Sequence, residues 1–150
     1  MEMTLIKIAF VTTLALLWYP IAAGASPIDT KPWTRGECRR LLDAMVQVES
    51  GGRLDLVGDN GKAIGPLQIH RRCWVDAARY DKTLLSLGGK YEDCKRLEYA
   101  EKVVVAYWNC YASKSASWQE LACIHNGGPK GFGKKATQAY WAKVNKEMSK

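Results

Sequence analysis

The sequence predicts a single, mostly helical α+β domain with one small β-hairpin beside a cleft. Two observations predict this class. Apolar residues recur every three or four positions over most of the chain, as they do in helices that pack on a core. One stretch, residues 53–69, breaks that spacing and is dense in turn-forming residues. The chain is long enough to bury a core of its own, and no internal repeat suggests a second domain.

Residues 1–25 have the pattern of a secretory signal peptide. Lys7 precedes an apolar run over residues 8–18, and residues 23–25 (Ala-Gly-Ala) have the small side chains of a cleavage site. The run is short for a transmembrane helix, and Pro20 interrupts its end. We therefore expect a secreted, extracellular domain over residues 26–150, with no membrane anchor after cleavage.

The first helix is predicted from its two ends. Residues 34–37 (Thr-Arg-Gly-Glu) have the S/T-x-x-E form of a capping box, which predicts that the helix begins there. Gly51 and Gly52 predict its end, because glycine adopts the left-handed conformation that terminates many helices. Glu49 should therefore lie in or next to the last turn. The apolar stripe between the two ends is Cys38, Leu41, Leu42, Met45 and Val48.

The following segment predicts a small hairpin. Gly58-Asp59-Asn60-Gly61 is typical of a tight turn, and short apolar pieces flank it at residues 54–57 and 63–69. From there to the C-terminus the spacing is again helical, with Ser117 or Ser115 as candidate N-cap of one helix. The expected helices span about 72–80, 92–111, 117–124 and 134–148.

The chain is basic, with a formal net charge of +7 that survives removal of residues 1–25, since that segment holds one acid and one base. A basic secreted protein is attracted to polyanions, and bacterial cell walls are one such partner. The 22 Lys and Arg residues are scattered rather than arranged in a stripe, which does not favour a nucleic-acid partner. Charge alone does not decide the function.

All five cysteines follow residue 25, so an oxidising compartment predicts two disulfide bonds and one remaining thiol. No C-x-x-C pair is present, and His70 and His125 are the only histidines. This pattern predicts no metal site and no cofactor.

Two carboxylates are candidates for chemistry, because hydrolysis of a glycosidic bond needs one acid and one group that steadies the sugar cation. Glu49 would face the negative end of a helix dipole and be partly buried, and both effects favour the protonated form that a general acid needs. Asp59 is the natural partner, although an Asp in a glycine-rich turn often serves only the turn. Asp55 is a rival that spacing does not exclude.

Four further residues are candidates for substrate binding. The Gln68 amide could hydrogen-bond a sugar acetamido group, or it could cap a loop. The loop that begins with His125 and Asn126 ends a helix, and Gly127 would let the backbone approach a ligand closely.

These motifs resemble the invertebrate-type (i-type, destabilase-like) lysozymes over roughly residues 38–148. The resemblance rests on the segments at 48–52, 65–69, 74–76 and 91–94, and most specifically on residues 125–131 (His-Asn-Gly-Gly-Pro-Lys-Gly), followed by Tyr140-Trp141. It implies a lysozyme-like fold and hydrolysis of the β-1,4 bond between N-acetylmuramic acid and N-acetylglucosamine in peptidoglycan. It also implies that Glu49 is the general acid and Asp59 the nucleophile or cation stabiliser.

The chain departs from this family in two respects. Only Cys94 falls on a family cysteine, and Asn60-Gly61-Lys62-Ala63 replaces a serine-containing loop to which isopeptidase activity is ascribed. The sequence therefore predicts a muramidase without isopeptidase activity. Lytic transglycosylases have a similar pattern and use a single glutamate. A third hypothesis is a non-catalytic, cationic wall-binding antimicrobial protein.

Overall fold

The computed structural model describes residues 32–86 and 89–150, so the predicted signal peptide at 1–25 lies outside the described residues. The helices are α1 (Arg39–Ser50), α2 (Arg71–Tyr80), α3 (Thr83–Ser86), α4 (Leu97–Tyr111), α5 (Trp118–Gly127) and α6 (Lys135–Met148). The strands are β1 (Val57–Gly58), β2 (Ala63–Ile64) and β3 (Ile69–His70), and the 3-10 turns are η1 (Asp59–Gly61), η2 (Tyr91–Lys95) and η3 (Gly131–Gly133). The predicted mostly helical α+β class is confirmed.

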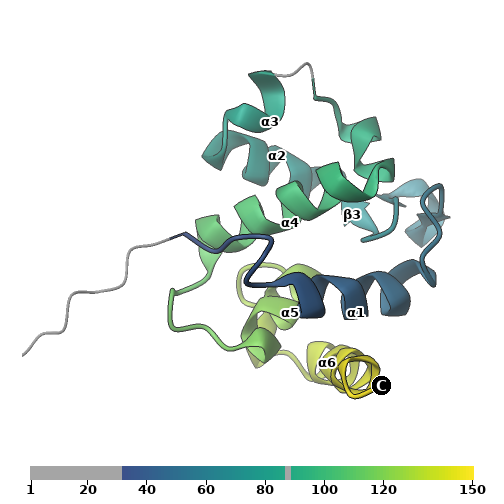
Figure 1. Ribbon diagram of the computed structural model, residues 1–150, viewed down its shortest axis with the longest axis vertical. Coiled ribbons are helices and arrows are strands. Elements are labelled where there is room, and N and C mark those ends of the chain that lie inside the picture. Colours follow the sequence, from purple (N-terminus) through teal and green to yellow (C-terminus); the bar gives the residue numbers. More distant parts are fainter. Residues whose placement is uncertain (1–31, 87–88) are drawn as a thin grey trace, which may run out of the picture.

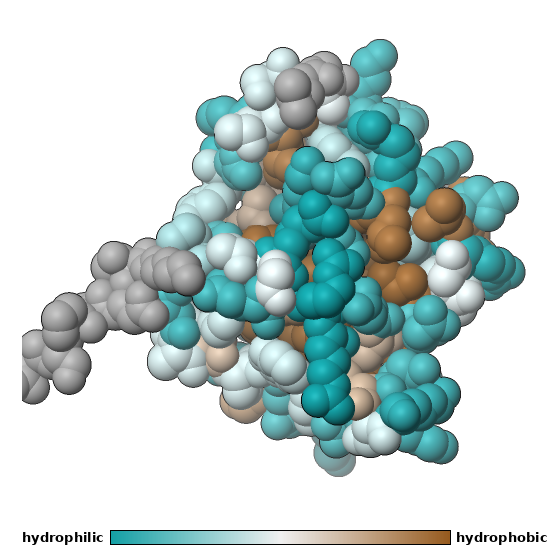
Figure 2. Space-filling model, viewed as in Figure 1, coloured by the Kyte–Doolittle hydropathy of each residue, from teal (hydrophilic) through white to brown (hydrophobic). Residues whose placement is uncertain are grey.

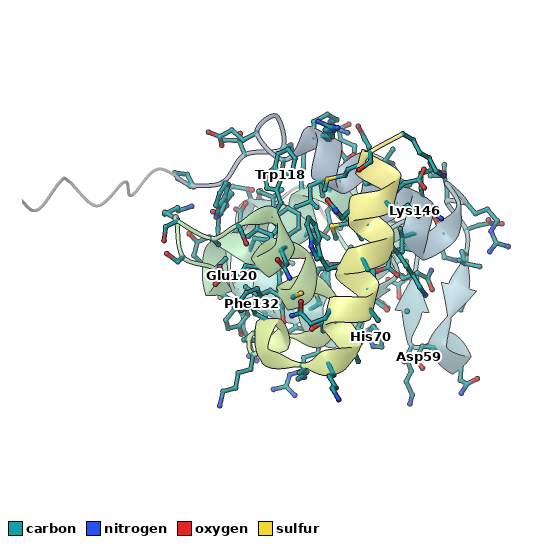
Figure 3. All side chains as sticks on the ribbon, turned by 90° about the horizontal axis from the view of Figure 1, so that it is seen from below. Asp59, His70, Trp118, Glu120, Phe132 and Lys146 are labelled. Carbon is teal, nitrogen blue, oxygen red and sulfur yellow. The ribbon has the colours of Figure 1, made fainter. Side chains whose placement is uncertain are left out.

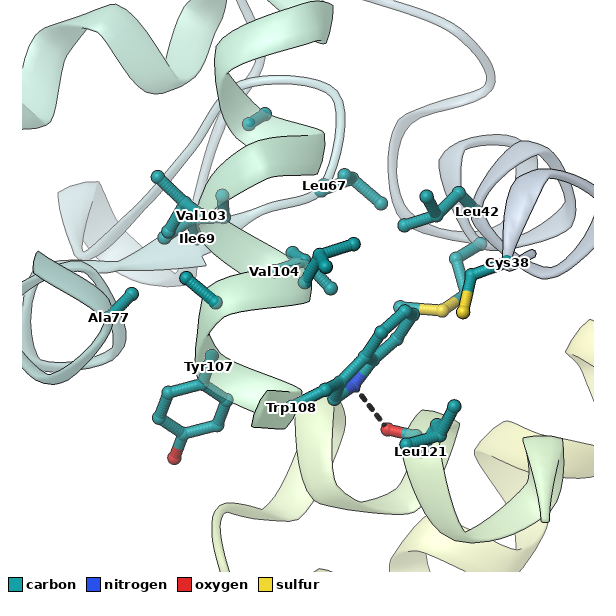
Figure 4. Close-up of a cluster of buried hydrophobic side chains, with 14 of the residues drawn as sticks. Cys38, Leu42, Leu67, Ile69, Ala77, Val103, Val104, Tyr107, Trp108 and Leu121 are labelled. Atoms are coloured by element: carbon teal, nitrogen blue, oxygen red, sulfur yellow. Dashed lines mark hydrogen bonds between the residues drawn. The ribbon is translucent and has the colours of Figure 1, made fainter. Parts of the chain in front are cut away.

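Helix α4 runs through the middle of the molecule (Figure 1). Helix α2 packs on it from one side and α5 from the other, while α6 packs against α1 and α5. Trp108 of α4 is fully buried at this junction, and its indole N–H donates to the carbonyl of Leu121 in α5 at 2.8 Å (Figure 4). The ring thus buries a large apolar area without leaving its donor unpaired. This core fixes α1 and α5 relative to each other.

Helix α1 starts later than its capping box predicts. Thr34 and Glu37 do exchange hydrogen bonds, from the Thr34 amide to Glu37 Oε2 (3.0 Å) and from the Glu37 amide to Thr34 Oγ1 (3.2 Å). The box closes a turn, however, and the helix begins only at Arg39. Gly36 lies inside the turn, and its low helical propensity is consistent with this delay.

The C-terminal end of α1 is where the sequence predicts it. Gly51 adopts the left-handed conformation (φ 60°), and its amide donates to the carbonyl of Gln47 at 3.0 Å. The amide of Gly52 donates to the carbonyl of Val46 at 3.4 Å, which completes a glycine-terminated helix end. Glu49 is therefore the penultimate residue of α1, as expected.

The predicted hairpin is part of a three-stranded antiparallel sheet in the order β1-β2-β3. Val57 lies opposite Ile64, and Ala63 lies opposite His70. The sheet is too short to be stable alone. Tyr91 of η2 braces it, because its hydroxyl donates to the carbonyl of Ile69 at 2.7 Å and lies 3.0 Å from that of Lys62.

The single helix predicted over residues 92–111 is wrong, because Arg96 is extended (φ −87°, ψ 122°) and separates η2 from α4. The Asp93 carboxylate accepts from the Lys90 amide at 2.8 Å, which closes η2 as a separate turn. The other three late helices are confirmed within a few residues, and the Ser117 hydroxyl caps α5 by accepting from the Glu120 amide. The short α3 and η3 were not predicted.

The cysteines differ from the expectation of two disulfide bonds, since all five are free thiols in the structure. Cys38, Cys94 and Cys123 are fully buried, and each packs as a small apolar side chain from a different element. Burial raises the pKa of the Cys38 thiol to about 11 and that of Cys94 to about 12. The expectation came from the number of cysteines and the expected oxidising compartment. Neither shows where each side chain lies in the fold.

Hydrophilic residues cover most of the face seen in Figure 2, and apolar patches gather toward the side that holds the small sheet. Leu54 and Val57, just before and within β1, are about half exposed (50% and 52%). Within residues 32–86 and 89–150, no helix is long and apolar enough to cross a membrane.

Candidate active site

The site is built around Glu49, which the C-terminal turn of α1 presents to α5 and α6. Its side chain is 15% exposed, and its Oε1 lies 3.4 Å from Nε2 of His125, whose side chain is 5% exposed. His125 belongs to the last turn of α5, a helix that the Trp108–Leu121 hydrogen bond ties to the core. A carboxyl group and an imidazole therefore meet where little water can reach them.

Tyr140 of α6 closes the site from another direction. Its ring centroid lies 6.5 Å from that of His125, with the two planes tilted by 34°. Burial raises the pKa of the Tyr140 phenol well above its usual value, and the nearby Glu49 charge raises it further. The hydroxyl is buried, and the group it interacts with is the Glu49 carboxyl group, although their geometry falls short of a full hydrogen bond. Glu49 is thus enclosed by side chains from α5 and α6.

A cavity of about 250 Å³ adjoins this pair. Its lining comes from β3, α2, α4 and α5 with their flanking loops: Gln68, Ile69, His70, Arg72, Cys73, Tyr107, His125, Asn126 and Gly128. None of the tryptophans at 33, 74, 108, 118 and 141 lines it, whereas the Tyr107 ring does. A largely buried tyrosine beside polar groups and two histidines suits a ligand that offers both apolar surface and hydroxyls, as a sugar does.

Asp59 lies on the sheet side of the same cavity. Its Oδ2 is 3.5 Å from Nε2 of His70, a residue of the cavity lining, and both side chains are about half exposed (55% and 52%). Figure 3 shows the two side chains close together beside the strands. Asp59 has a positive φ of 48°, as expected of a turn residue. Asp55 is exposed and makes no ion pair or hydrogen bond in the described chain.

Two of the predicted substrate-binding residues, Gln68 and Asn126, differ in whether their side-chain amide is free to bind a ligand. Gln68 donates from Nε2 to the carbonyls of Leu56 (3.1 Å) and Gly65 (2.9 Å), so both amide hydrogens hold the loop together. Asn126 is exposed and lines the cavity, which leaves its amide free for a ligand. Substrate contact by either residue stays a prediction.

The glycines after His125 serve the packing of α5 on α6. A Cβ on Gly127 would come within 2.5 Å of the Thr137 methyl group, and the Gly127 carbonyl accepts from Lys134 Nζ at 2.6 Å. A Cβ on Gly131 would overlap the backbone carbonyl of Cys123. These close approaches bring the end of α5, and with it His125, against α6. Gly127 therefore has a structural reason to be glycine, whether or not it also contacts substrate.

Two features of the site were missed by sequence reasoning. His70 carried no motif of its own, although its place directly after Gln68-Ile69 put it beside the turn that holds Asp59. Tyr140 entered the sequence analysis only as part of the family resemblance, and α6 packing beside α1 and α5 brings it to Glu49. Within the described residues, no group of three or more His, Cys, Asp or Glu side chains is placed to hold a metal ion.

Known proteins of similar sequence and structure are lysozymes of bivalve molluscs. The chain is 33% identical to Lysozyme 1 of Crassostrea virginica over 112 residues, and 36% identical to a lysozyme of Ostrea edulis over 87 residues. These matches cover 71% and 55% of this chain but only 57% and 58% of the relatives' lengths, so the chain spans just over half of each oyster protein.

Solved structures give the same relationship. The Meretrix lusoria lysozyme, crystallised in complex with the protein PliI of Aeromonas hydrophila, superposes with a TM-score of 0.60 at 30% identity, covering 72% of this chain and 88% of that one. The Tapes japonica lysozyme also gives a TM-score of 0.60, at 27% identity. The sequence model of the destabilase family matches residues 37–147, nearly the whole described chain. The resemblance drawn from the motifs is thereby confirmed, and the chain belongs to the destabilase family.

Proposed function

We propose that this chain is a secreted muramidase that hydrolyses the β-1,4 bond between N-acetylmuramic acid and N-acetylglucosamine in bacterial peptidoglycan. The observation that carries the proposal is the pairing of each candidate carboxylate with a histidine of one cavity. Glu49 meets His125 where water is largely excluded, and Asp59 meets His70 in partly solvated surroundings. Glycosidases need this division between a protonated and an ionised carboxyl group.

Each residue has a distinct role in the proposed reaction. Glu49 donates its proton to the glycosidic oxygen, so the leaving sugar departs as a neutral alcohol. Asp59 stabilises the sugar cation as nucleophile or as ion-pair partner, and a water molecule, deprotonated by Glu49, completes hydrolysis. Asn126 and the Tyr107 ring, which line the cavity, contact the sugar. The net charge of +7 attracts the chain to the anionic wall.

The proposal is tested by peptidoglycan digestion with product masses. Glu49→Gln should lower kcat by at least about 100-fold, as expected for loss of a general acid, and leave the fold intact. Glu92→Gln, at an exposed glutamate of η2, is the matched control and should keep full activity. Bacteriolysis that survives Glu49→Gln would sink the enzymatic proposal and favour a non-catalytic, cationic mode of killing.

The second carboxylate is tested in the same assay. Asp59→Asn should lower kcat by about 10- to 100-fold, whereas Asp55→Asn, at the exposed rival position, should not. If Asp59→Asn is fully active and the main products are anhydromuropeptides, the chain is a lytic transglycosylase that uses Glu49 alone.

A further inference from the structure

His125 has one polar neighbour and one orphan nitrogen. Its Nε2 lies 3.4 Å from Glu49 Oε1, and its Nδ1 is buried with no hydrogen-bond partner among the described residues. Only 5% of the side chain is exposed, although it forms part of the cavity wall. The nitrogen that is not sealed off is Nε2, and the polar group it faces is the Glu49 carboxyl group.

The orphan nitrogen also selects a tautomer. A proton on Nδ1 would be a buried donor without an acceptor, which costs more than a bare lone pair in the same place. The proton therefore belongs on Nε2, where it faces Glu49. In this tautomer the ring offers its N–H to the carboxyl group, with Nε2 3.4 Å from Glu49 Oε1.

Other elements restrict Glu49 as well. Tyr140 faces the same carboxyl group from α6, and Cys123 of α5 lies near enough to Tyr140 for the two to interact electrostatically. The titratable groups on the far wall of the cavity, His70 and Arg72, come from β3 and α2. Of these, His125 is the group whose ring nitrogen is aimed at Glu49.

We propose that His125 is a positioning residue, whose Nε2–H holds the Glu49 carboxyl group at the cavity in the orientation needed for proton transfer. This inference rests on the proposed role of Glu49 as general acid. It separates His125 from Asn126, its neighbour in sequence, which remains free for the sugar.

Two substitutions of His125 by amide side chains of different length test the inference. In His125→Gln the side-chain amide nitrogen extends to about the place of Nε2, whereas in His125→Asn it reaches only that of Nδ1. We expect His125→Asn to lower kcat by about 10- to 100-fold, as a small misplacement of a reacting group does, with KM nearly unchanged. The pH profile of kcat should shift as well. His125→Gln should restore most of kcat. Thermal unfolding of both variants separates these effects from loss of the fold.

The outcomes also distinguish this inference from the proposed function. Loss of activity in Glu49→Gln together with a wild-type kcat and pH profile in His125→Asn would overturn the positioning role and leave the muramidase standing. A rise in KM at constant kcat would assign His125 to substrate binding and overturn the inference too. On the Glu49→Gln background, His125→Asn should have no further effect, because it acts through the glutamate.

Discussion

Two carboxylate–histidine pairs lie beside the cavity, one at its helical wall and one at its sheet wall; the histidines line the cavity and the carboxylates lie behind them. On the helical wall, Glu49 and His125 are 15% and 5% exposed and are held by three packed helices. On the sheet wall, Asp59 and His70 are 55% and 52% exposed and extend from a three-residue 3-10 turn and a two-residue strand. Their N–O distances are nearly equal, at 3.4 and 3.5 Å, so the difference lies in burial and in the rigidity of the support.

This difference fits the two roles proposed above. A glycosidase needs one carboxyl group that donates a proton and one that stabilises positive charge, and their surroundings set the two apart. The same contrast predicts that the helical wall tolerates change poorly and that the sheet wall tolerates it well.

The largest expected effect is on the helical wall, from Gly131→Ala. The added methyl group would overlap the Cys123 backbone carbonyl, which cannot move without shifting α5. We expect a loss of about 2 kcal/mol in the free energy of unfolding, typical of overpacking, measured by urea denaturation. Gly133→Ala, two residues away with nothing near its added Cβ, should be nearly neutral. An equal loss in the free energy of unfolding for Gly131→Ala and Gly133→Ala would contradict the idea that the packing at Gly131 is rigid.

The corresponding change on the sheet wall is Gly58→Ala. Its Cβ would overlap Gln68 Oε1, which is the far end of a flexible side chain. The amide can rotate away at the cost of its bonds to the loop, so we expect a loss of about 1 kcal/mol, smaller than for Gly131→Ala. A loss as large as that of Gly131→Ala would show that the sheet wall is equally rigid.

Alkaline pH tests how far the helical wall is buried. Because burial and the Glu49 charge raise the pKa of Tyr140 above the usual value of about 10, the unfolded chain loses this proton first as pH rises. The stabilisation is fully present below about pH 10 and is lost as pH climbs toward the folded-state pKa.

Tyr140→Phe should make the loss of stability above pH 10 shallower. At pH 7 it should change stability by less than about 1 kcal/mol, since the contact of the hydroxyl with Glu49 falls short of a full hydrogen bond. An unchanged alkaline slope would contradict this account.

The smallest effect is expected from His70→Gln on the sheet wall. An exposed ion pair contributes at most about 0.5 kcal/mol, and salt screens it. Stability should change by no more than that, and the difference from wild type should vanish at high salt. A tenfold fall in kcat would mean that His70 positions Asp59 as strictly as His125 is proposed to position Glu49, and the contrast between the walls would fail.

Local patterns predicted the elements that depend on neighbours in sequence. The stop at Gly51, the Ser117 cap and the hairpin around Asp59 all follow from backbone preferences within a few residues, and all are confirmed. The break at Arg96 was missed, because apolar spacing continues across it and the Asp93–Lys90 hydrogen bond that closes η2 has no distinctive motif. The two expected disulfide bonds are not present, because the number of cysteines and the expected compartment do not show which side chains meet.

The sequence by itself determined the order of the helices and strands. It also placed Glu49 at a helix end and Asp59 in a turn. Those properties are set by bonds and conformations spanning a few residues. Only the tertiary structure decided which side chains meet. His125 lies 76 positions from Glu49 along the chain and 3.4 Å from it in space, because α5 packs closely on α6 through glycines and both helices pack beside α1. Burial of one carboxylate and exposure of the other arise from that packing, since a residue's access to water depends on helices distant in sequence.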